Sequence, residues 1–160
     1  MIRRVNESDA EEIASIYNEY IATSTITFEV EPLSVSHMRE RIERLSAEFP
    51  YLVYEKNGKV GGFCYAHRWK DRAAYDHTLE TTIYLSPAFQ HQGIGTLLMK
   101  RLVSECRSMG IVVLVACITY GNEASVRMHE KLGFEQVSHF KRVGMKFGRY
   151  LDVVDLQLVL

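Results

Sequence analysis

The chain has 160 residues, of which 47% are hydrophobic and 24% charged, and its formal net charge is -1. This size and composition fit one globular domain over residues 1–160. A nearly neutral chain lacks the broad basic surface of proteins that bind nucleic acid or anionic membranes, so we expect neither partner.

The sequence also bears on the compartment and on metals. It has no apolar run of membrane-spanning length and no signal-peptide core near Met1. Its cysteines, Cys64, Cys106 and Cys117, are widely spaced and form neither a CxxC pair nor a zinc-ligand pattern. We therefore expect a cytoplasmic protein with free thiols and no bound metal.

The first elements follow from turn and capping residues. A short strand is predicted to end at Val5. Ser8 and Glu11 have the spacing of a capping box, which predicts the start of an amphipathic helix. A second helix is predicted to start at Ser36 and to end before Pro50.

Three strands are expected next. Residues 51–56 and 60–67 flank Asn57-Gly58, a dipeptide that favours a type I′ turn and hence a hairpin. A further strand is predicted over residues 76–85.

The second half alternates helices and strands. An apolar stripe predicts a helix from Ile94 to Met109, with Gly110 just beyond its end. The unbroken apolar run from Val112 to Ile118 predicts a strand buried on both faces, in which Cys117 is a core residue. Asn122 is predicted to cap a helix that ends at Gly133.

Strands over 134–141 and 151–159 complete the order β-α-α-β-β-β-α-β-α-β-β. The strand, glycine loop, helix and strand between residues 79 and 118 make a crossover unit, so the fourth and fifth strands are expected to be parallel. The remaining connections are hairpin-like. The sequence thus predicts an α/β fold with a mixed, mostly antiparallel sheet and helices on both faces.

The loop Gln90-His91-Gln92-Gly93-Ile94-Gly95 is the strongest functional signal. A tight turn into a helix presents unpaired backbone N–H groups at the positive end of the helix dipole, which suits a phosphate anion. No lysine follows Gly95 as in a Walker A loop, and Leu98 stands where a dinucleotide fingerprint has its third glycine. The alternative reading is a plain strand-to-helix turn.

Further motifs favour a ligand. Gln90-x-x-Gly93-x-Gly95 resembles the pyrophosphate loop of the GNAT N-acetyltransferases. More narrowly, the chain is similar to the phosphinothricin and methionine sulfoximine acetyltransferase branch of that superfamily. The segments that match this branch in order are 23–32, 69–76, 80–84, 125–130 and 144–148, and residues 122–134 resemble a later helix of the superfamily that ends in Leu-Gly-Phe.

The resemblance implies a GNAT fold and an acetyl-CoA-dependent N-acetyltransferase that acts on a small amino acid or analogue, with a homodimer as the expected assembly. It places the pyrophosphate on the glycine loop and the pantetheine arm beside the strand before it. Asn122 and Ser125 would contact the arm from the other side, although Asn122 also reads as a plain helix cap. The cofactor residues so implied are Ile83, Tyr84, Leu85, Gln90, His91, Gln92, Gly93, Ile94, Gly95, Asn122 and Ser125.

Acetyl transfer to an ammonium needs a base, an oxyanion donor and a proton for the leaving thiolate. Glu80 is the expected base, since partial burial would raise its pKa; the alternative is a salt-bridged carboxylate at a sheet edge. His129 stands where the wider superfamily often has a tyrosine that protonates the sulfur, and it serves either that proton transfer or the packing of the helix. The oxyanion donor is expected to be a backbone N–H near Leu85. No nucleophile arrangement is evident, so we expect direct attack on bound acetyl-CoA.

The acceptor site is expected near a basic segment. Arg72 and Tyr75 suit a carboxylate or phosphinate, and Phe28 would wall the pocket or else belong to the core. Arg68 and Lys70 read as solvated. Two alternatives remain open: a GNAT enzyme for another amine, such as a protein N-terminus or an antibiotic, and a non-catalytic acyl-CoA-binding module.

Overall fold

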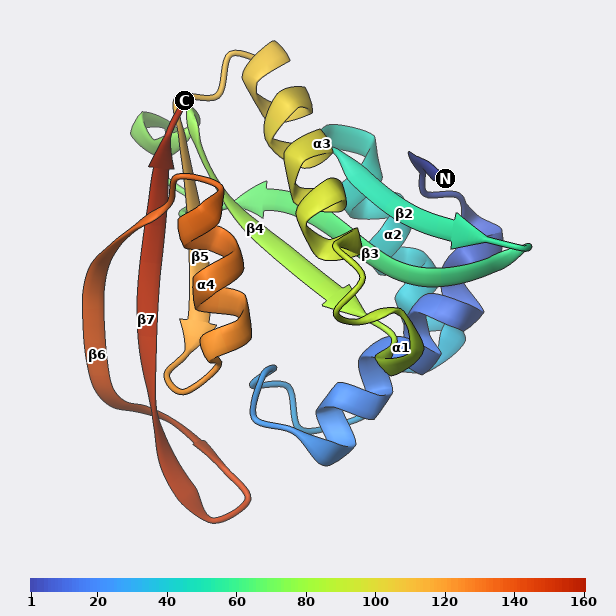
Figure 1. The fold of residues 1–160 in the computed structure, drawn as a ribbon, viewed down its shortest axis with the longest axis horizontal. Coiled ribbons are helices and arrows are strands. Elements are labelled where there is room, and N and C mark those ends of the chain that lie inside the picture. Colours follow the sequence, from blue (N-terminus) through green and yellow to red (C-terminus); the bar gives the residue numbers. More distant parts are fainter.

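A seven-stranded sheet forms the centre of the computed structural model, which describes residues 1–160 (Figure 1). The strand order is β1-β2-β3-β4-β5-β7-β6, and neighbours are antiparallel except for the parallel pair β4 and β5. The strands are β1 (Ile2–Arg4), β2 (Tyr51–Lys56), β3 (Lys59–Arg68), β4 (Thr78–Leu85), β5 (Val113–Thr119), β6 (Glu135–Lys146) and β7 (Arg149–Val159).

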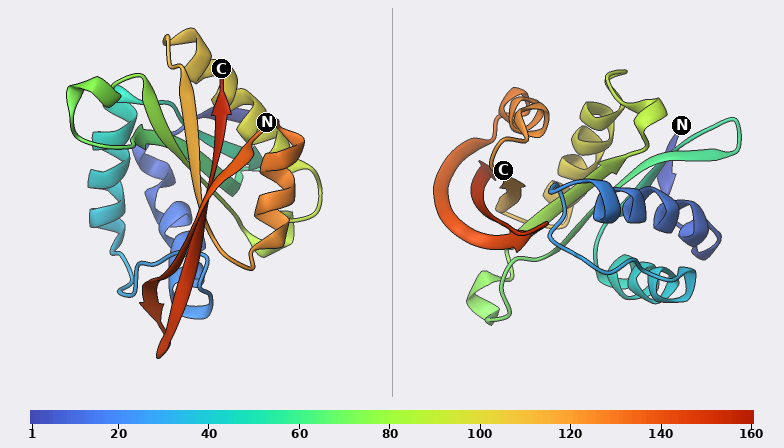
Figure 2. Two further views of the ribbon diagram at one scale, coloured as in Figure 1. Left: turned by 90° about the vertical axis from the view of Figure 1, so that its left-hand side faces the viewer. Right: turned by 90° about the horizontal axis from the view of Figure 1, so that it is seen from below.

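Four α-helices cover the two faces of this sheet. Helices α1 (Ala10–Thr23) and α2 (Val35–Glu48) lie against one face, and α3 (Ile94–Ser108) and α4 (Glu123–Lys131) lie against the other, as Figure 2 shows. The predicted α/β class, with a mixed sheet and a parallel pair at the fourth and fifth strands, is confirmed. None of the helices combines the length and the apolar character that crossing a membrane requires.

Each helical layer closes its own hydrophobic core. On the α3 side, Leu98, Leu102 and Cys106 are fully buried against the sheet. On the other side, Ile13 and Ile42 are buried against β2 and β3. Burying a leucine side chain contributes about 1.5–3 kcal/mol, so the α3 stripe fixes where the N-terminal turn of that helix lies on the sheet.

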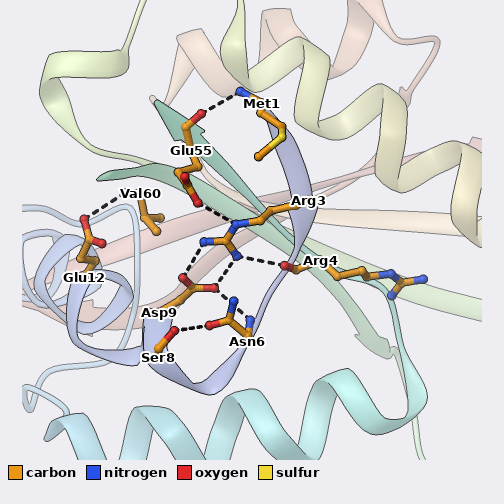
Figure 3. A network of polar contacts seen from close by, with 9 residues as sticks. All are labelled: Met1, Arg3, Arg4, Asn6, Ser8, Asp9, Glu12, Glu55 and Val60. Carbon is orange, nitrogen blue, oxygen red and sulfur yellow. Dashed lines mark hydrogen bonds and ion pairs between the residues drawn. The ribbon is translucent and has the colours of Figure 1, made fainter. Parts of the chain in front are cut away.

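The chain enters α1 through a polar network (Figure 3). The predicted capping box of Ser8 and Glu11 is wrong, because Asn6 caps a short 3-10 turn and its backbone N–H donates to the Asp9 carboxylate at 2.9 Å. The same carboxylate accepts two hydrogen bonds of 2.8 Å from the Arg3 guanidinium. The cap lies earlier because Asp9, only 4% exposed, serves both the turn and the arginine of β1.

Helix α2 also starts earlier than predicted. Its cap is Ser34, whose Oγ accepts a hydrogen bond from the backbone N–H of His37 at 3.1 Å. Ser34 has the extended backbone that a cap position requires, whereas Ser36 lies inside the first turn.

The final hairpin is longer than residues 134–141 and 151–159 suggested. Strands β6 and β7 pair as far as Lys146 and Arg149, around a turn at Phe147 and Gly148. A break in register between Phe140 and Gly144 hides the alternation of this segment, which is why the pattern ended early.

The glycine turns agree with the sequence. Asn57 and Gly58 both have positive φ, 54° and 75°, and Lys56 pairs with Lys59, as a two-residue type I′ hairpin requires. Gly110 follows the end of α3 with φ 81°.

Strand β5 differs from its prediction at one position. It is not buried on both faces throughout, because Cys117 is exposed. Strand β4 pairs with β5 only as far as Ala116, so the side chain of Cys117 opens onto a cleft instead of the core.

Candidate active site

The divergence of β4 from β5 opens a cleft in the sheet. The two strands pair only between Thr78–Thr81 and Val113–Ala116, although β4 continues to Leu85 and β5 to Thr119. Beyond the paired segment, these two strand edges have no strand between them. An extended, amide-rich ligand can hydrogen-bond to such free edges as an added strand does.

One arm of the cleft, about 520 Å³, lies between the glycine loop and α4. Most of the residues predicted to bind a cofactor line it. The lining includes Ile83, Tyr84, Leu85, Gln90, His91, Gly93, Ile94, Gly95, Asn122 and Ser125. Gln92 does not line this arm; its side chain donates instead to the carbonyl oxygen of Ala88 at 2.8 Å.

The glycine loop opens α3 in the way that anion sites require. Gly93 is the N-cap, with φ 76°, and its carbonyl accepts the first bond of the helix from Leu97 N–H at 3.1 Å. The amides of Ile94 to Thr96 therefore precede the first intrahelical carbonyl partner. Gly95 serves packing, because a Cβ there would lie 3.0 Å from the Met128 sulfur.

Gln90 connects the loop to the first helix. Its amide Nε2 donates to the Tyr20 hydroxyl at 2.9 Å, and that hydroxyl donates to the Leu85 carbonyl at 2.5 Å. The chain Gln90–Tyr20–Leu85 fixes the loop against the end of β4. Tyr20 lines the cleft and is a site residue that the sequence reading missed.

Helix α4 forms the opposite wall. Asn122 caps it by accepting a hydrogen bond from Ser125 N–H, and both residues also face the cleft. Arg127 and Lys131 line the same arm and were missed as well. Their spacing of four residues puts them on one face of α4, so helical periodicity combined with charge was a signal that could have found them.

The second arm of the cleft, about 300 Å³, brings the two predicted catalytic residues together. Glu80 of β4 and His129 of α4 both line it, and so does Phe28 from the segment between α1 and α2. The two arms share Ile26, Ile83, Tyr84, Asn122 and Ser125, which makes them one continuous cleft.

Glu80 occupies a partly buried position beside the gap. Its side chain is 24% exposed, and its Oε1 lies 3.8 Å from His67 Nε2. Burial raises the pKa of Glu80 above its ordinary value; His67 lowers it, and the negative charge of Asp155 raises it further. A carboxylate of raised basicity suits acceptance of a proton from an ammonium.

His129 is almost fully buried, with 2% of its surface exposed. Its Nδ1 lies 2.8 Å from the carbonyl oxygen of Ser125, and its ring meets Phe134 edge to face. Burial lowers the pKa of His129 below 6.5 despite that hydrogen bond. The imidazole is therefore neutral at pH 7.

The segment that carries Phe28 is held down on the sheet. Thr119 Oγ1 donates to the Thr25 carbonyl at 2.7 Å, and Lys146 Nζ donates to the Thr27 carbonyl at 2.9 Å. A Cβ at Gly144 would overlap the Phe28 ring, so the glycine lets the ring lie directly on β6.

The predicted acceptor residues are not all gathered at the cleft. Phe28 lines it, whereas Arg72 and Tyr75 lie outside its lining, at a short 3-10 turn before β4. Tyr75 packs edge to face against Trp69 with ring centroids 5.3 Å apart, and the ammonium of Lys70 lies over both rings. The side chains of His, Cys, Asp and Glu form no group of three or more that would hold a metal ion.

Comparison with known proteins identifies the fold and the family. Residues 2–154 match the family model described as Acetyltransferase (GNAT) domain. The phosphinothricin N-acetyltransferase of Streptomyces viridochromogenes is 38% identical over 152 residues, which cover 95% of this chain and 83% of that protein. The L-methionine sulfoximine/L-methionine sulfone acetyltransferase of Salmonella typhimurium is 34% identical, covering 99% of this chain and 94% of that protein.

A solved structure agrees with these relatives. The GNAT superfamily phosphinothricin acetyltransferase from Sinorhizobium meliloti, in complex with acetyl-CoA, superposes with a TM-score of 0.96 at 33% identity. That match covers 100% of this chain and 88% of the other. The chain belongs to the GNAT N-acetyltransferases, in the branch of the phosphinothricin and methionine sulfoximine acetyltransferases.

Proposed function

We propose that this protein transfers an acetyl group from acetyl-CoA to the α-amine of a small amino acid or analogue, of the phosphinothricin or methionine sulfoximine type. One observation carries the proposal: Glu80 and His129, from different elements, line the same cleft that continues to the glycine loop. The names of the relatives support the acceptor class.

The cleft fits acetyl-CoA. The amides of the first turn of α3 are free to hold the pyrophosphate, as are the backbone groups of His91 to Gly95. Arg127 and Lys131 add two positive charges to the same arm for the remaining phosphate. The edge of β4 from Ile83 to Leu85 would receive the pantetheine amides. When bound, acetyl-CoA supplies the thioester from which the acetyl group is taken.

Glu80 would take the proton from the acceptor ammonium, directly or through a water molecule. Its raised pKa makes it a better base than an exposed glutamate. A backbone N–H near Leu85 would hydrogen-bond the thioester oxygen as negative charge develops there. The free amine then attacks without a covalent enzyme intermediate.

His129 has a narrower role than a simple acid. The Ser125 carbonyl can only accept, so the proton of the neutral ring is on Nδ1 and Nε2 carries a lone pair. Such a ring delivers a proton to the leaving sulfur only after it has accepted one from the reacting nitrogen. We assign His129 this relay, with proton acceptance and donation at Nε2.

The acceptor carboxylate is assigned to Arg72 and Tyr75, with Phe28 as a wall. Arg72 has no ion-pair partner within the chain, so its guanidinium is free for an anion. Because both residues lie outside the cleft lining, this assignment requires the 69–76 segment to approach a bound acceptor.

A homodimer remains part of the proposal. The hairpin of β6 and β7 exposes large apolar side chains, and β6 is an edge strand with one unpaired side. We assign a second copy of the chain to this surface, formed by Val137, Phe140, Val143, Met145, Phe147 and Tyr150. Sedimentation of the wild type and of Val143→Asp would test it: a dimer that the substitution converts to a monomer is expected, and a wild-type monomer would refute it.

The activity itself is tested by CoA release with a panel of amines. The panel contains phosphinothricin, methionine sulfoximine, methionine sulfone, spermidine and a peptide with a free N-terminus. Release with the amino-acid analogues is expected, after subtraction of the signal from the exposed Cys117 thiol. Release with spermidine or the peptide alone would indicate another acceptor. If acetyl-CoA binds in calorimetry but no amine causes release of CoA, the protein is a non-catalytic acyl-CoA-binding module.

A further inference from the structure

A second carboxylate lies on the same face of the sheet as Glu80, and the proposed chemistry does not use it. Asp155 of β7 stands directly across from Cys117 of β5 in the antiparallel register. Glu80 pairs with Val115, two positions before Cys117, so the three side chains share one face. Cys117 lines the arm of the cleft that contains Glu80.

The thiol fixes the orientation of Asp155. Cys117 Sγ donates to Asp155 Oδ1 at 2.8 Å, which holds the carboxylate against a residue that lines the cleft. Burial and that carboxylate raise the pKa of the Cys117 thiol, so it stays protonated and keeps donating near neutral pH. The backbone N–H of Asp155 is also held, by Ser138 Oγ at 3.2 Å.

No cation neutralises Asp155. It forms no ion pair, whereas Asp152 on the same strand pairs with His139 Nε2 at 2.8 Å and accepts a hydrogen bond from Arg142 N–H. The charge of Asp155 is therefore free to act on its surroundings, and the pKa of Glu80 responds to it.

The other groups around Glu80 are few. His67 and Tyr65 face it from β3, and Cys117 faces it from β5. The segment between α1 and α2 contributes Thr27 and Phe28 to this arm of the cleft, and neither is charged near neutral pH. His129 of α4 also lines this arm and is neutral near pH 7, so His67 is the one other potential cation next to Glu80, and Asp155 is the opposing anion.

We propose that Asp155, oriented by the Cys117 thiol, is a positioning residue whose negative charge makes Glu80 a stronger base toward the acceptor ammonium. A fixed like charge disfavours the ionised form of a neighbouring carboxylate and so strengthens its hold on a proton. The inference rests on the proposed function, because it requires Glu80 to act as the base.

The test is the pH dependence of kcat/KM for methionine sulfoximine in wild type and Asp155→Asn. Glu80 must be ionised to accept the proton, so activity falls as the pH drops through its pKa. Removing the charge of Asp155 lowers that pKa, and the acid limb should move to lower pH by about 0.5 to 1 unit. Asp155→Ser, which also removes the charge, keeps the test available should the Asn variant not fold.

The matched control is Asp152→Asn, which removes a carboxylate from the same strand without touching the cleft. Its acid limb should coincide with that of the wild type, and Asp155→Glu should restore most of the shift. If the acid limb of the kcat/KM profile does not move in Asp155→Asn and Asp155→Ser, while Glu80→Gln is inactive, the role of Asp155 is overturned. Glu80 would still be the base. A Glu80→Gln variant that turns over at the wild-type rate would overturn the proposed base itself.

Discussion

The imidazole Nδ1 of His129 donates its proton to the carbonyl oxygen of Ser125, one helical turn earlier, across 2.8 Å. The ring belongs to α4, and this bond fixes both its tautomer and its orientation. Its other nitrogen is therefore an acceptor in the resting protein. The two catalytic candidates therefore differ: burial raises the pKa of the Glu80 carboxyl group, whereas His129 is a neutral imidazole with a lowered pKa.

We expect Glu80→Gln to lower kcat more than His129→Ala does. The glutamine cannot accept the ammonium proton, so a loss of about 100-fold or more is expected, whereas loss of the relay should cost about 10-fold. Steady-state kinetics at saturating acetyl-CoA measures both. A Glu80→Gln enzyme with unchanged kcat, or a His129→Ala enzyme that is the more impaired of the two, would contradict the assignment.

The buried histidine should make the fold sensitive to mild acid. Its pKa is lowered in the folded state, so below 6.5 the unfolded chain binds this proton before the folded one does. Stability from this group is present above 6.5 and is lost as the pH falls toward the folded pKa. Urea unfolding at several pH values between 7.5 and 5 should therefore show a steeper decline for the wild type than for His129→Asn; parallel curves would refute it.

Gly93 is expected to matter for the cofactor and Gly110 only for stability. Both have positive φ, 76° and 81°, and a Cβ at either would meet open space. Alanine should cost about 1 kcal/mol of unfolding free energy at each position, because an L side chain disfavours this backbone. Only Gly93→Ala should also weaken acetyl-CoA binding in calorimetry. Equal affinities for the two variants would argue against the loop as the pyrophosphate seat.

Arg72→Ala should raise KM for acceptors that carry a carboxylate. A guanidinium–carboxylate contact contributes more than a neutral hydrogen bond, so an increase of about 10-fold is expected for methionine sulfoximine. The matching amine without a carboxylate should change little. Arg68→Ala is the control, since Arg68 is already paired with Asp76 at 2.5 Å. If Arg72→Ala raises KM equally for both acceptors, the residue has a general role in the loop.

Asp9→Asn should destabilise the protein without affecting the chemistry. The substitution removes the negative charge of a carboxylate that accepts two hydrogen bonds from Arg3 and one from the backbone N–H of Asn6. We expect it to lower the free energy of unfolding by about 2–3 kcal/mol near pH 7. Although burial opposes ionisation, these partners lower the pKa of Asp9 below 3.8, so the stabilisation is lost as the pH falls through the folded pKa. The difference in unfolding free energy between wild type and variant should shrink as the pH falls below 3.8, measured by chemical unfolding; a constant difference would contradict this.

Local sequence patterns predicted which helices and strands form, but they predicted less well where α1 and α2 begin. Asn57-Gly58 forms the expected hairpin because its preference for positive φ acts within two residues. The caps at Asn6 and Ser34 were displaced from Ser8 and Ser36, because several polar residues near each start can accept from a helix N–H. Residues outside the helix determine which of these polar residues becomes the cap. At the start of α1, for example, the guanidinium of Arg3 binds the Asp9 carboxylate.

The two predicted catalytic residues show the same difference between what local patterns and what distant contacts determine. The motif identified Glu80 and His129 individually, and the alternation of β4 placed Glu80 on a definite face. That both residues reach one cleft depends on the divergence of β4 from β5, and on the packing of α4 over the opening. The predicted core position of Cys117 failed for the same reason, since an apolar run does not reveal where its neighbouring strand departs.

The sequence by itself determined the order of helices and strands, the glycine turn into α3 and the family. These depend on side-chain periods, backbone preferences and short motifs, all of which act within a few residues. Tertiary structure alone decided the gap between β4 and β5, the burial of His129 and the approach of Asp155 to Cys117. Those features arise from contacts between residues far apart in the chain, whose geometry is set only when the two layers of helices pack on the sheet.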